Sequence, residues 1–239
     1  MTELQIRTLL MTFFLCFYSE PVETGLQEPH ELFSLWRTQQ GEWATLRSPR
    51  TCDHFSIGGN DHRVAQVLRH CKNRRHRLWI LNSGPEHLKQ LRAFARHQEI
   101  CVAHDVLTRE RSRLPTQVKI CDDNDPPAIS IRLPFSPLKN LYPKRAVWIK
   151  NSGILILGDA TPQMQAEFKN KLGAPIKILV LAHHGMHPHK SLTALSAAAS
   201  DLNRFGQSRV SQKNQDSLTR RKIPIIKTTD WGNLHFELK

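Results

Sequence analysis

The chain has 239 residues, and its 34 Lys and Arg against 21 Asp and Glu give a formal net charge of +13. Hydrophobic residues make up 39%, which excludes a disordered chain, and 11 Gly with 14 Pro exclude a collagen-like one. A chain of this length can bury a sizeable core. The positive charge favours a polyanionic partner such as DNA or an anionic membrane surface, although many basic proteins bind neither.

An apolar run near the N-terminus, residues 8–18 (TLLMTFFLCFY), is shorter than the roughly 20 residues of a membrane-spanning helix. It resembles a signal-peptide core that follows Arg7, but Glu3 weakens the basic leader and no A-x-A cleavage site follows. We expect residues 1–24 to be a signal-like segment or a membrane anchor, and residues 25–239 to form one domain. An exported or membrane-associated location and a cytoplasmic one both stay open.

The chain has five cysteines, and none of them lies in a CxxC motif. The odd number excludes a framework in which every cysteine is paired. We therefore predict free, buried thiols. The cysteines are Cys16, Cys52, Cys71, Cys101 and Cys121.

Hydrophobic periodicity and turn residues predict strands and helices interspersed along the chain. Strands are expected at 32–36, 43–46, 78–81, 129–133, 146–149, 154–157, 176–181, 223–227 and 234–238. Helices are expected around 64–68 and at 86–97, 162–172 and 190–202, with a loop at 121–127. The strands at 146–149 and 154–157 form a hairpin. This order is typical of a mixed α/β layered fold.

Two buried strands end in side chains that can bind a metal. ILGD ends in Asp159, and ILVLAHHG ends in His183 and His184. Loops just after strand ends combine a rigid scaffold with exposed side chains, and carboxylate plus imidazole suits zinc or manganese. The alternative is that Asp159 caps the following helix and the two histidines are polar loop residues.

These segments resemble the metallo-β-lactamase fold and, more narrowly, the soluble C-terminal domain of ComEC-type competence (DNA-uptake) channels. Further segments in the family's order are similar to its opening hairpin, its glycine turn, its Asn-Arg-Tyr-Gly-His segment and its closing strands. They are residues 40–46, 56–59, 203–207 and 223–234. The resemblance covers approximately residues 32–239. It implies an α/β (α+β) fold, an αββα sandwich of two mixed sheets flanked by helices.

The chain departs from this family at its main metal motif, His-x-His-x-Asp-His. Asn82 and Gly84 stand at the two positions of the first histidines, Glu86 replaces the aspartate, and His87 alone matches. Asn and Gly cannot replace imidazole as strong zinc ligands. The opening aspartate of the family's glycine loop is also replaced, by Glu42, and later positions carry Met186 and Gln207. A complete binuclear site is not expected.

The resemblance implies a reduced site in which His87, Asp159, His183 and His184 hold zinc or manganese, unless the chain has lost its metal. Glu86 and Asp159 would be the catalytic carboxylates. His187 and His189 follow in HHGMHPH and are alternative ligands. The implied ancestral activity is metal-dependent phosphodiester hydrolysis, impaired here. The alternatives are a non-catalytic member that binds DNA or another protein, and an accessory protein anchored to a membrane through residues 8–18.

Two basic clusters, KNRRHR (72–77) and TRRK (219–222), could contact the phosphates of a nucleic acid. The alternative is that each is a solvated face. The candidate nucleic-acid contacts are Lys72, Arg74, Arg75, Arg77, Arg220 and Arg221.

Overall fold

The computed structural model describes residues 31–38, 41–59, 61–81, 84–102, 114–121, 129–132, 145–169, 172, 174–186, 192, 194–199 and 210–238. All of them belong to one compact unit, Glu31–Lys239. The predicted N-terminal segment, residues 1–24, lies outside the described residues, and so does the apolar run at 8–18. No helix within the described ranges combines the length and the apolar character needed to cross a membrane.

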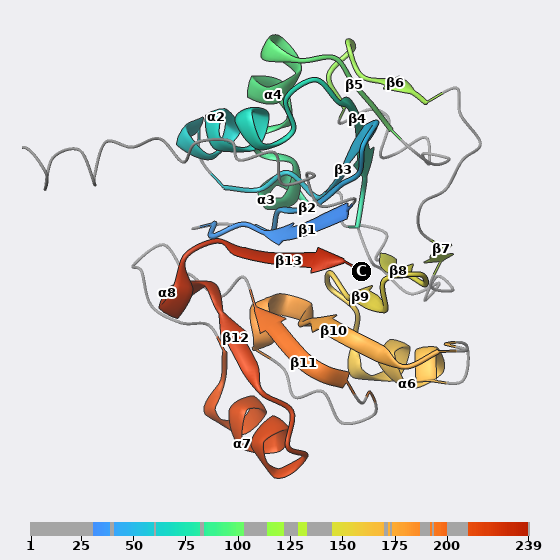
Figure 1. The fold of residues 1–239 in the computed structure, drawn as a ribbon, viewed down its shortest axis with the longest axis vertical. Coiled ribbons are helices and arrows are strands. Elements are labelled where there is room, and N and C mark those ends of the chain that lie inside the picture. Colours follow the sequence, from blue (N-terminus) through green and yellow to red (C-terminus); the bar gives the residue numbers. More distant parts are fainter. Residues whose placement is uncertain are drawn as a thin grey trace, which may run out of the picture. The chain divides into compact units, whose positions relative to one another are not determined.

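The first sheet has seven strands in the order β13-β1-β2-β3-β4-β5-β6 (Figure 1). The strands at one side, from β13 to β3, pair antiparallel, and β3, β4, β5 and β6 pair parallel. Their bounds are β1 Glu31–Leu35, β2 Ala44–Arg47, β3 Thr51–Phe55, β4 Arg75–Trp79, β5 Ile100–Val102, β6 Lys119–Ile120 and β13 Leu234–Leu238.

The second sheet has six strands in the order β12-β11-β10-β9-β8-β7. It is also mixed, because β9 to β12 pair parallel while β7, β8 and β9 pair antiparallel. Their bounds are β7 Ile129–Arg132, β8 Arg145–Ile149, β9 Ile154–Ile156, β10 Ile176–Val180, β11 Ala194–Ala199 and β12 Ile225–Lys227.

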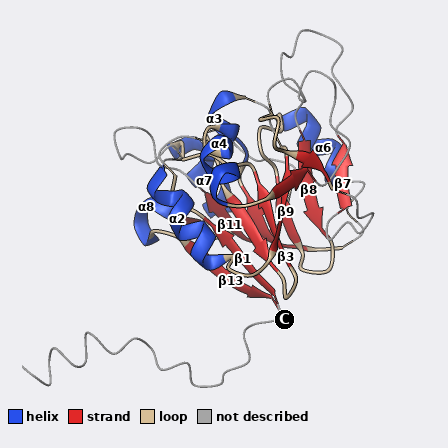
Figure 2. Ribbon diagram, turned by 90° about the horizontal axis from the view of Figure 1, so that it is seen from above, coloured by secondary structure: helices blue, strands red, loops and turns tan. Residues whose placement is uncertain are grey.

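The helices are short. Their bounds are α2 Asp61–His70, α3 Pro85–Leu88, α4 Leu91–His97, α6 Pro162–Lys169, α7 Gln212–Arg220 and α8 Thr228–Trp231, with a 3₁₀ turn, η1, at Ala182–Gly185. Figure 2 shows the helices beside the strands of the fold. The fold is therefore mixed α+β, with two mixed sheets and few helices.

Three hydrophobic clusters explain this layering. The middle cluster joins the inner faces of both sheets, with Phe33 and Phe55 from the first and Ile156 and Val180 from the second. A second cluster packs α2 and α4 against the outer face of the first sheet. The third packs α6 and α7 against the outer face of the second sheet. Burial of these three layers is the main favourable free energy of folding.

A buried ion pair lies on the inner face of the first sheet. Asp53 on β3 is fully buried, and Arg77 on β4 donates from Nη2 to its Oδ2 at 2.8 Å. The indole N–H of Trp79 donates to Oδ1 at 2.7 Å. Burial raises the pKa of Asp53, and the hydrogen bonds and charge of Arg77 oppose that rise. Because the guanidinium group of Arg77 is buried and paired with Asp53, it cannot contact a phosphate, and its predicted role as a nucleic-acid contact is wrong.

Most predicted strands are confirmed within one or two residues, and the helix predicted at 86–97 is divided into α3 and α4. The helix predicted at 190–202 is wrong, because residues 194–199 form β11. The sequence ALSAAA favours a helix by propensity. However, β11 lies between β10 and β12, where both edges are paired and small side chains fit between sheet and helices.

The prediction of free thiols is also wrong for the cysteines that the structure describes. Cys52 on β3 pairs with Cys71, which follows α2, and Cys101 on β5 pairs with Cys121, which follows β6. Each bridge closes a loop of about 20 residues within the first sheet's half of the fold. Cys16, the odd fifth cysteine, lies outside the described residues.

Two stacked histidines make the first sheet sensitive to acid. His54 is fully buried and its ring stacks on that of His76, with His54 Nε2 2.9 Å from His76 Nδ1. Burial, with a smaller contribution from His76, lowers the pKa of His54 well below its ordinary value. Burial also lowers the pKa of His76 to about 4.

We expect His76→Gln to reduce the loss of stability in acid. An unfolded imidazole takes up a proton near pH 6.5, whereas the folded one stays neutral to about pH 4. Stability is therefore lost as pH falls through this window, by up to about 3 kcal/mol. Urea unfolding of the variant and the wild type at pH 7 and pH 4.5 measures the difference. The exposed His97→Gln should keep the wild-type slope, and an equal slope in His76→Gln would contradict the assignment.

Candidate functional site

The loop between β3 and α2 positions two candidate residues through its backbone. The N–H of Ile57 donates to the carbonyl of His87 at 2.7 Å, and the carbonyl of Ile57 accepts from the N–H of Gln90 at 3.1 Å. The N–H of Gly58 donates to the carbonyl of Glu42 at 3.0 Å. These bonds fix Glu42, just before β2, and His87, on α3, relative to the carboxyl end of β3.

The second sheet brings Asp159 to the same place. After β9 ends, Gly158 turns the chain with φ +52°, and Asp159 follows. An Oδ2 atom of Asp159 lies 3.5 Å from Nε2 of His87, whose side chain is buried. Because His87 belongs to the first sheet's half of the fold and Asp159 to the second, the candidate site lies where the strand ends of both sheets meet.

Glu42 interacts electrostatically with both His87 and Asp159, and its pKa is strongly raised. The side chain is buried, and burial raises its pKa to about 7, with the charge of His87 opposing and that of Asp159 adding to the rise. Two carboxyl groups and one imidazole, from residues 42, 87 and 159, thus interact in a largely desolvated volume. A divalent cation beside these groups would relieve the repulsion between the two carboxylates.

The histidine pair follows the neighbouring strand. β9 and β10 are parallel partners, so their carboxyl ends lie side by side. His183 and His184 stand in η1, directly after β10, and His184 is half-buried with φ +57°. The side chain of His183 lies outside the described part of the structure. The backbone therefore places both histidines at the edge that holds Asp159.

Gly185 ends this turn and packs tightly. Its φ is +84°, and a Cβ at this position would lie 2.9 Å from a methyl group of Val210. The carbonyl of Gly185 accepts a hydrogen bond of 2.9 Å from Nδ2 of Asn214, which is fully buried on α7. The first turn of α7 therefore holds the histidine turn against the second sheet.

The remaining predicted site positions divide as follows. Gly84 is buried and precedes α3 as its N-cap, so this position supplies no ligand. Glu86 lies on α3 next to His87, but its side chain lies outside the described part of the structure. Asn82 also falls outside the described residues, as do His187 and His189.

Glu42 is the site residue that the predicted ligand set omitted. Glu42 stands at the sequence position that corresponds to the opening aspartate of the resembled family, and this correspondence could have indicated a role in the site. However, replacement of Asp by Glu in a loop is common, so the sequence alone did not single out Glu42. A second omission is the group Cys52, His54 and Cys71, whose potential ligand atoms all lie within 4.8 Å of one another. These three residues are scattered over 20 positions in the sequence, and Cys52 and Cys71 are joined as a disulfide.

The basic clusters do not surround the site. Lys72, Arg74 and Arg75 lie where the chain enters β4, whereas the site lies beyond its other end. Five residues of strand separate the two ends by roughly 13 Å. Arg74 is partly engaged, since its Nε donates to the carbonyl of Ser48 at 2.9 Å.

The second cluster is similar. Arg220 is exposed at the end of α7, and Arg221 donates a hydrogen bond to the carbonyl of Leu192, which precedes β11. Since β10, β11 and β12 are parallel, this cluster also lies toward the strand starts, away from the histidine turn.

Comparison with known proteins gives little further information. The sequence matches no protein-family model, and no curated protein is similar to it. A solved structure described as "Peroxy diiron species of chemotaxis sensor ODP" has a TM-score of 0.38 and 16% sequence identity. The match covers 56% of this chain and 62% of that chain, less than two thirds of its length. At this level of similarity it carries no argument about fold or function.

We expect Glu42→Gln to remove a pH-dependent loss of stability from metal-free protein. Glu42 stays protonated to about pH 7 when folded but ionises near pH 4.5 when unfolded. The folded state therefore binds more protons in this window, and stability falls as pH rises through it, by about 3 kcal/mol at most. Urea unfolding with a chelator at pH 5 and pH 8 tests this. The exposed Glu99→Gln is the control, and an unchanged slope in Glu42→Gln would count against the assignment.

We expect Gly185→Ala to destabilise the fold by roughly 1–3 kcal/mol, because the added methyl group meets Val210 and the backbone has positive φ. Gly232→Ala is the matched control, since Gly232 has φ +78° but nothing within 4 Å of an added Cβ. Since Gly232 has ψ −135°, outside the left-handed helical region, this variant should cost the backbone strain alone, roughly 1–3 kcal/mol. Equal thermal unfolding midpoints for the two variants would show that the close packing of Gly185 is unimportant.

Proposed function

We propose that the described domain has a metallo-β-lactamase-like architecture related to the ComEC-type domain, and that its strand-end site binds a divalent metal ion. The observation that carries this is the convergence of Glu42, His87 and Asp159 from three distant segments. The two facing mixed sheets with helices outside, and the histidine turn beside Asp159, support the same proposal.

The donor set fits zinc or manganese by its chemistry. His87 offers an imidazole, Asp159 and Glu42 offer carboxylates, and His183 and His184 stand in the turn η1 that follows the adjacent strand β10. The raised pKa of Glu42 reflects a buried carboxyl group without enough positive charge around it. A cation held by Asp159 and His87 would supply that charge and favour the ionised form of Glu42.

The reaction proposed for this site is hydrolysis of phosphodiesters. A bound metal ion would lower the pKa of a water molecule and offset the charge of the phosphate. Asp159 and His87 would fix the position of that ion, since the backbone bonds of Ile57 and the turn at Gly158 hold both. Glu42, kept ionised by such a cation, could accept a proton at its carboxylate. Glu86 is the further candidate carboxylate on α3.

The rate is expected to be low. Gly84 has no side chain and Asn82 is a poor zinc ligand, so two imidazoles of the family's motif are missing. A site with fewer ligands holds its metal more weakly and positions a nucleophile less well.

A second candidate function is favoured by the place of the charge. Lys72, Arg75 and Arg220 are exposed, and they lie at strand starts instead of around the site. A non-catalytic protein that binds DNA through these residues needs no metal. Its binding would weaken steeply with salt, because phosphate contacts release counterions.

We expect Asp159→Ala to weaken metal binding tenfold or more and to abolish metal-dependent hydrolysis. The measurement uses the full chain without a His tag, titrated with Zn²⁺ or Mn²⁺ after chelation and assayed on a phosphodiester such as bis-p-nitrophenyl phosphate. Asp216→Ala, on the exposed side of α7, is the control and should behave as wild type. Hydrolysis that is unchanged in Asp159→Ala would overturn the proposal, and salt-sensitive DNA binding without hydrolysis would select the second candidate.

A further inference from the structure

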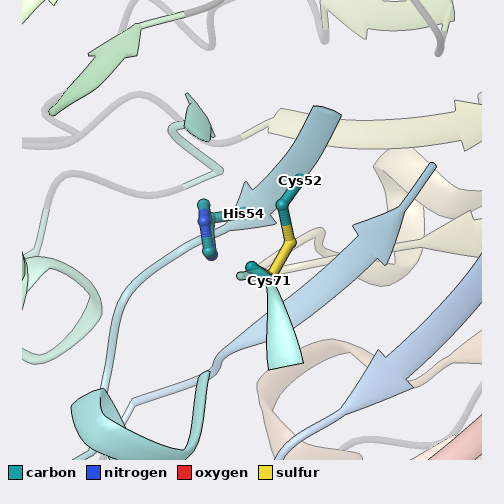
Figure 3. Close-up of side chains that lie close together, drawn as sticks. All are labelled: Cys52, His54 and Cys71. Atoms are coloured by element: carbon teal, nitrogen blue, oxygen red, sulfur yellow. A yellow bond between two sulfur atoms is a disulfide. The ribbon is translucent and has the colours of Figure 1, made fainter. Parts of the chain in front are cut away.

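A second cluster of metal-binding side chains lies beneath the helices of the first sheet, separate from the strand-end site. Cys52 and His54 are two apart on β3, so they share its outer face. Cys71 approaches them from the end of α2, and the potential ligand atoms of the three lie within 4.8 Å of one another (Figure 3). All three residues are buried.

A fourth side chain stands beside them. His76 on β4 is the register partner of Cys52, and its Nδ1 lies 2.9 Å from Nε2 of His54. His76 is 3% exposed. Cys52, His54 and Cys71 already lie together, and His76 contacts this group through His54. A small movement of the His76 ring toward the sulfurs would complete the two-sulfur, two-imidazole set that structural zinc sites use.

We propose that Cys52, Cys71, His54 and His76 form a buried Cys₂His₂ zinc site whenever the Cys52–Cys71 disulfide is reduced. The disulfide and the zinc site are then alternative states of the same four residues. The proposal does not depend on the function proposed for the strand-end site, which contains no cysteine.

The chemistry balances in two steps. A dithiol reductant gives two electrons and two protons to the disulfide, so the S–S bond breaks, two thiols form and the reductant becomes a disulfide. Zn²⁺ then binds both sulfurs as thiolates and two protons leave to solvent. The imidazoles bind in their neutral form, and burial keeps them neutral.

The hydrogen bond between Trp43 and His54 opposes metal binding, and its removal provides a further test of the site. The indole N–H of Trp43 donates to Nδ1 of His54 at 3.2 Å, so the imidazole proton lies on Nε2, facing His76. A metal ion on Nε2 replaces that proton, and the neutral ring then carries its proton on Nδ1, opposite the indole N–H. Binding therefore costs the Trp43 hydrogen bond. The two zinc–thiolate bonds offset this cost, because metal binding contributes far more to the stability of a structural zinc site than one hydrogen bond does.

The second disulfide is a natural control. Cys101 and Cys121 also form a disulfide, but among the described residues they do not lie together with a third side chain that could bind a metal ion. The contacts of the Cys101 sulfur are the carbonyl of His76 at 3.8 Å and the guanidinium of Arg75 at 3.9 Å. A guanidinium group is no metal ligand, so reduction of this bridge is not expected to create a second zinc site.

The test titrates the full chain, carrying Cys16→Ser, with Co²⁺ after anaerobic reduction and removal of the reductant. We expect one equivalent to give thiolate-to-cobalt charge-transfer bands with the visible bands of tetrahedral Co²⁺, and Zn²⁺ to displace it. Cys52→Ser/Cys71→Ser should lose these bands, Cys101→Ser/Cys121→Ser should keep them, and His54→Ala or His76→Ala should weaken binding at least tenfold. Absence of the bands in reduced protein, or their survival in Cys52→Ser/Cys71→Ser, overturns the proposal.

Two further measurements keep the test decisive if a cysteine variant fails to fold. Trp43→Phe removes the competing donor and should tighten Co²⁺ binding about tenfold, the equivalent of one hydrogen bond. In reduced protein, Zn²⁺ should slow alkylation of Cys52 and Cys71 at least tenfold while Cys101 and Cys121 react at unchanged rates. Weaker binding in Trp43→Phe, or equal protection of all four cysteines, contradicts the proposed site.

Discussion

The backbone of Ile57 and Gly58 is the constraint on which the candidate site depends. Three hydrogen bonds from these two residues hold the carbonyls of Glu42 and His87 and the N–H of Gln90. The side chain of Gln90 adds a fourth, from Nε2 to the carbonyl of Gly59 at 3.1 Å. Because these partners are backbone groups, the arrangement survives side-chain substitution. The backbone positions of Glu42 and His87 therefore depend little on which side chains stand at positions 57 and 58.

The two sheets contribute unequally to that site. The first sheet supplies Glu42 and His87 through loops tied together by hydrogen bonds. The second supplies Asp159 and the histidine turn from adjacent parallel strands, whose ends are joined by backbone bonds such as that from the N–H of Leu157 to the carbonyl of Val180. Contact between the halves at this edge rests on the middle hydrophobic cluster, so stability and site geometry are linked.

Many of the strands could be predicted from local sequence, and the predictions that were wrong or missing have physical explanations. Apolar strands such as the one that ends before Asp159 are recognisable because buried parallel strands are continuously hydrophobic. β3 was not predicted, since its sequence TCDHF mixes polar and apolar residues. Its Asp53 and His54 are buried only because Arg77 and His76 meet them from the next strand. The prediction for β11 was wrong for a different reason. Its alanines favour a helix, but pairing with β10 and β12 makes the segment a strand.

The candidate site was partly predictable. His87 and Asp159 were expected to act together, and they lie within 3.5 Å. The importance of Glu42 depends on its burial beside them, which one sequence does not reveal. Likewise, no spacing joins Cys52 to Cys71, because a helix and a turn bring the second cysteine back to the sheet.

The basic clusters and the strand-end site lie toward opposite ends of the strands. Binding of a polyanion and the chemistry of the site would therefore use different surfaces of the domain. The cluster at Lys72 follows α2 on the outer face of the first sheet, and the cluster at Arg220 follows α7 on the outer face of the second. A small ligand held where the chain enters β4 would lie roughly 13 Å, one strand length, from the end of β4 that faces the site. If both proposed functions hold, substitutions at the basic clusters would change binding and substitutions at the strand-end site would change hydrolysis.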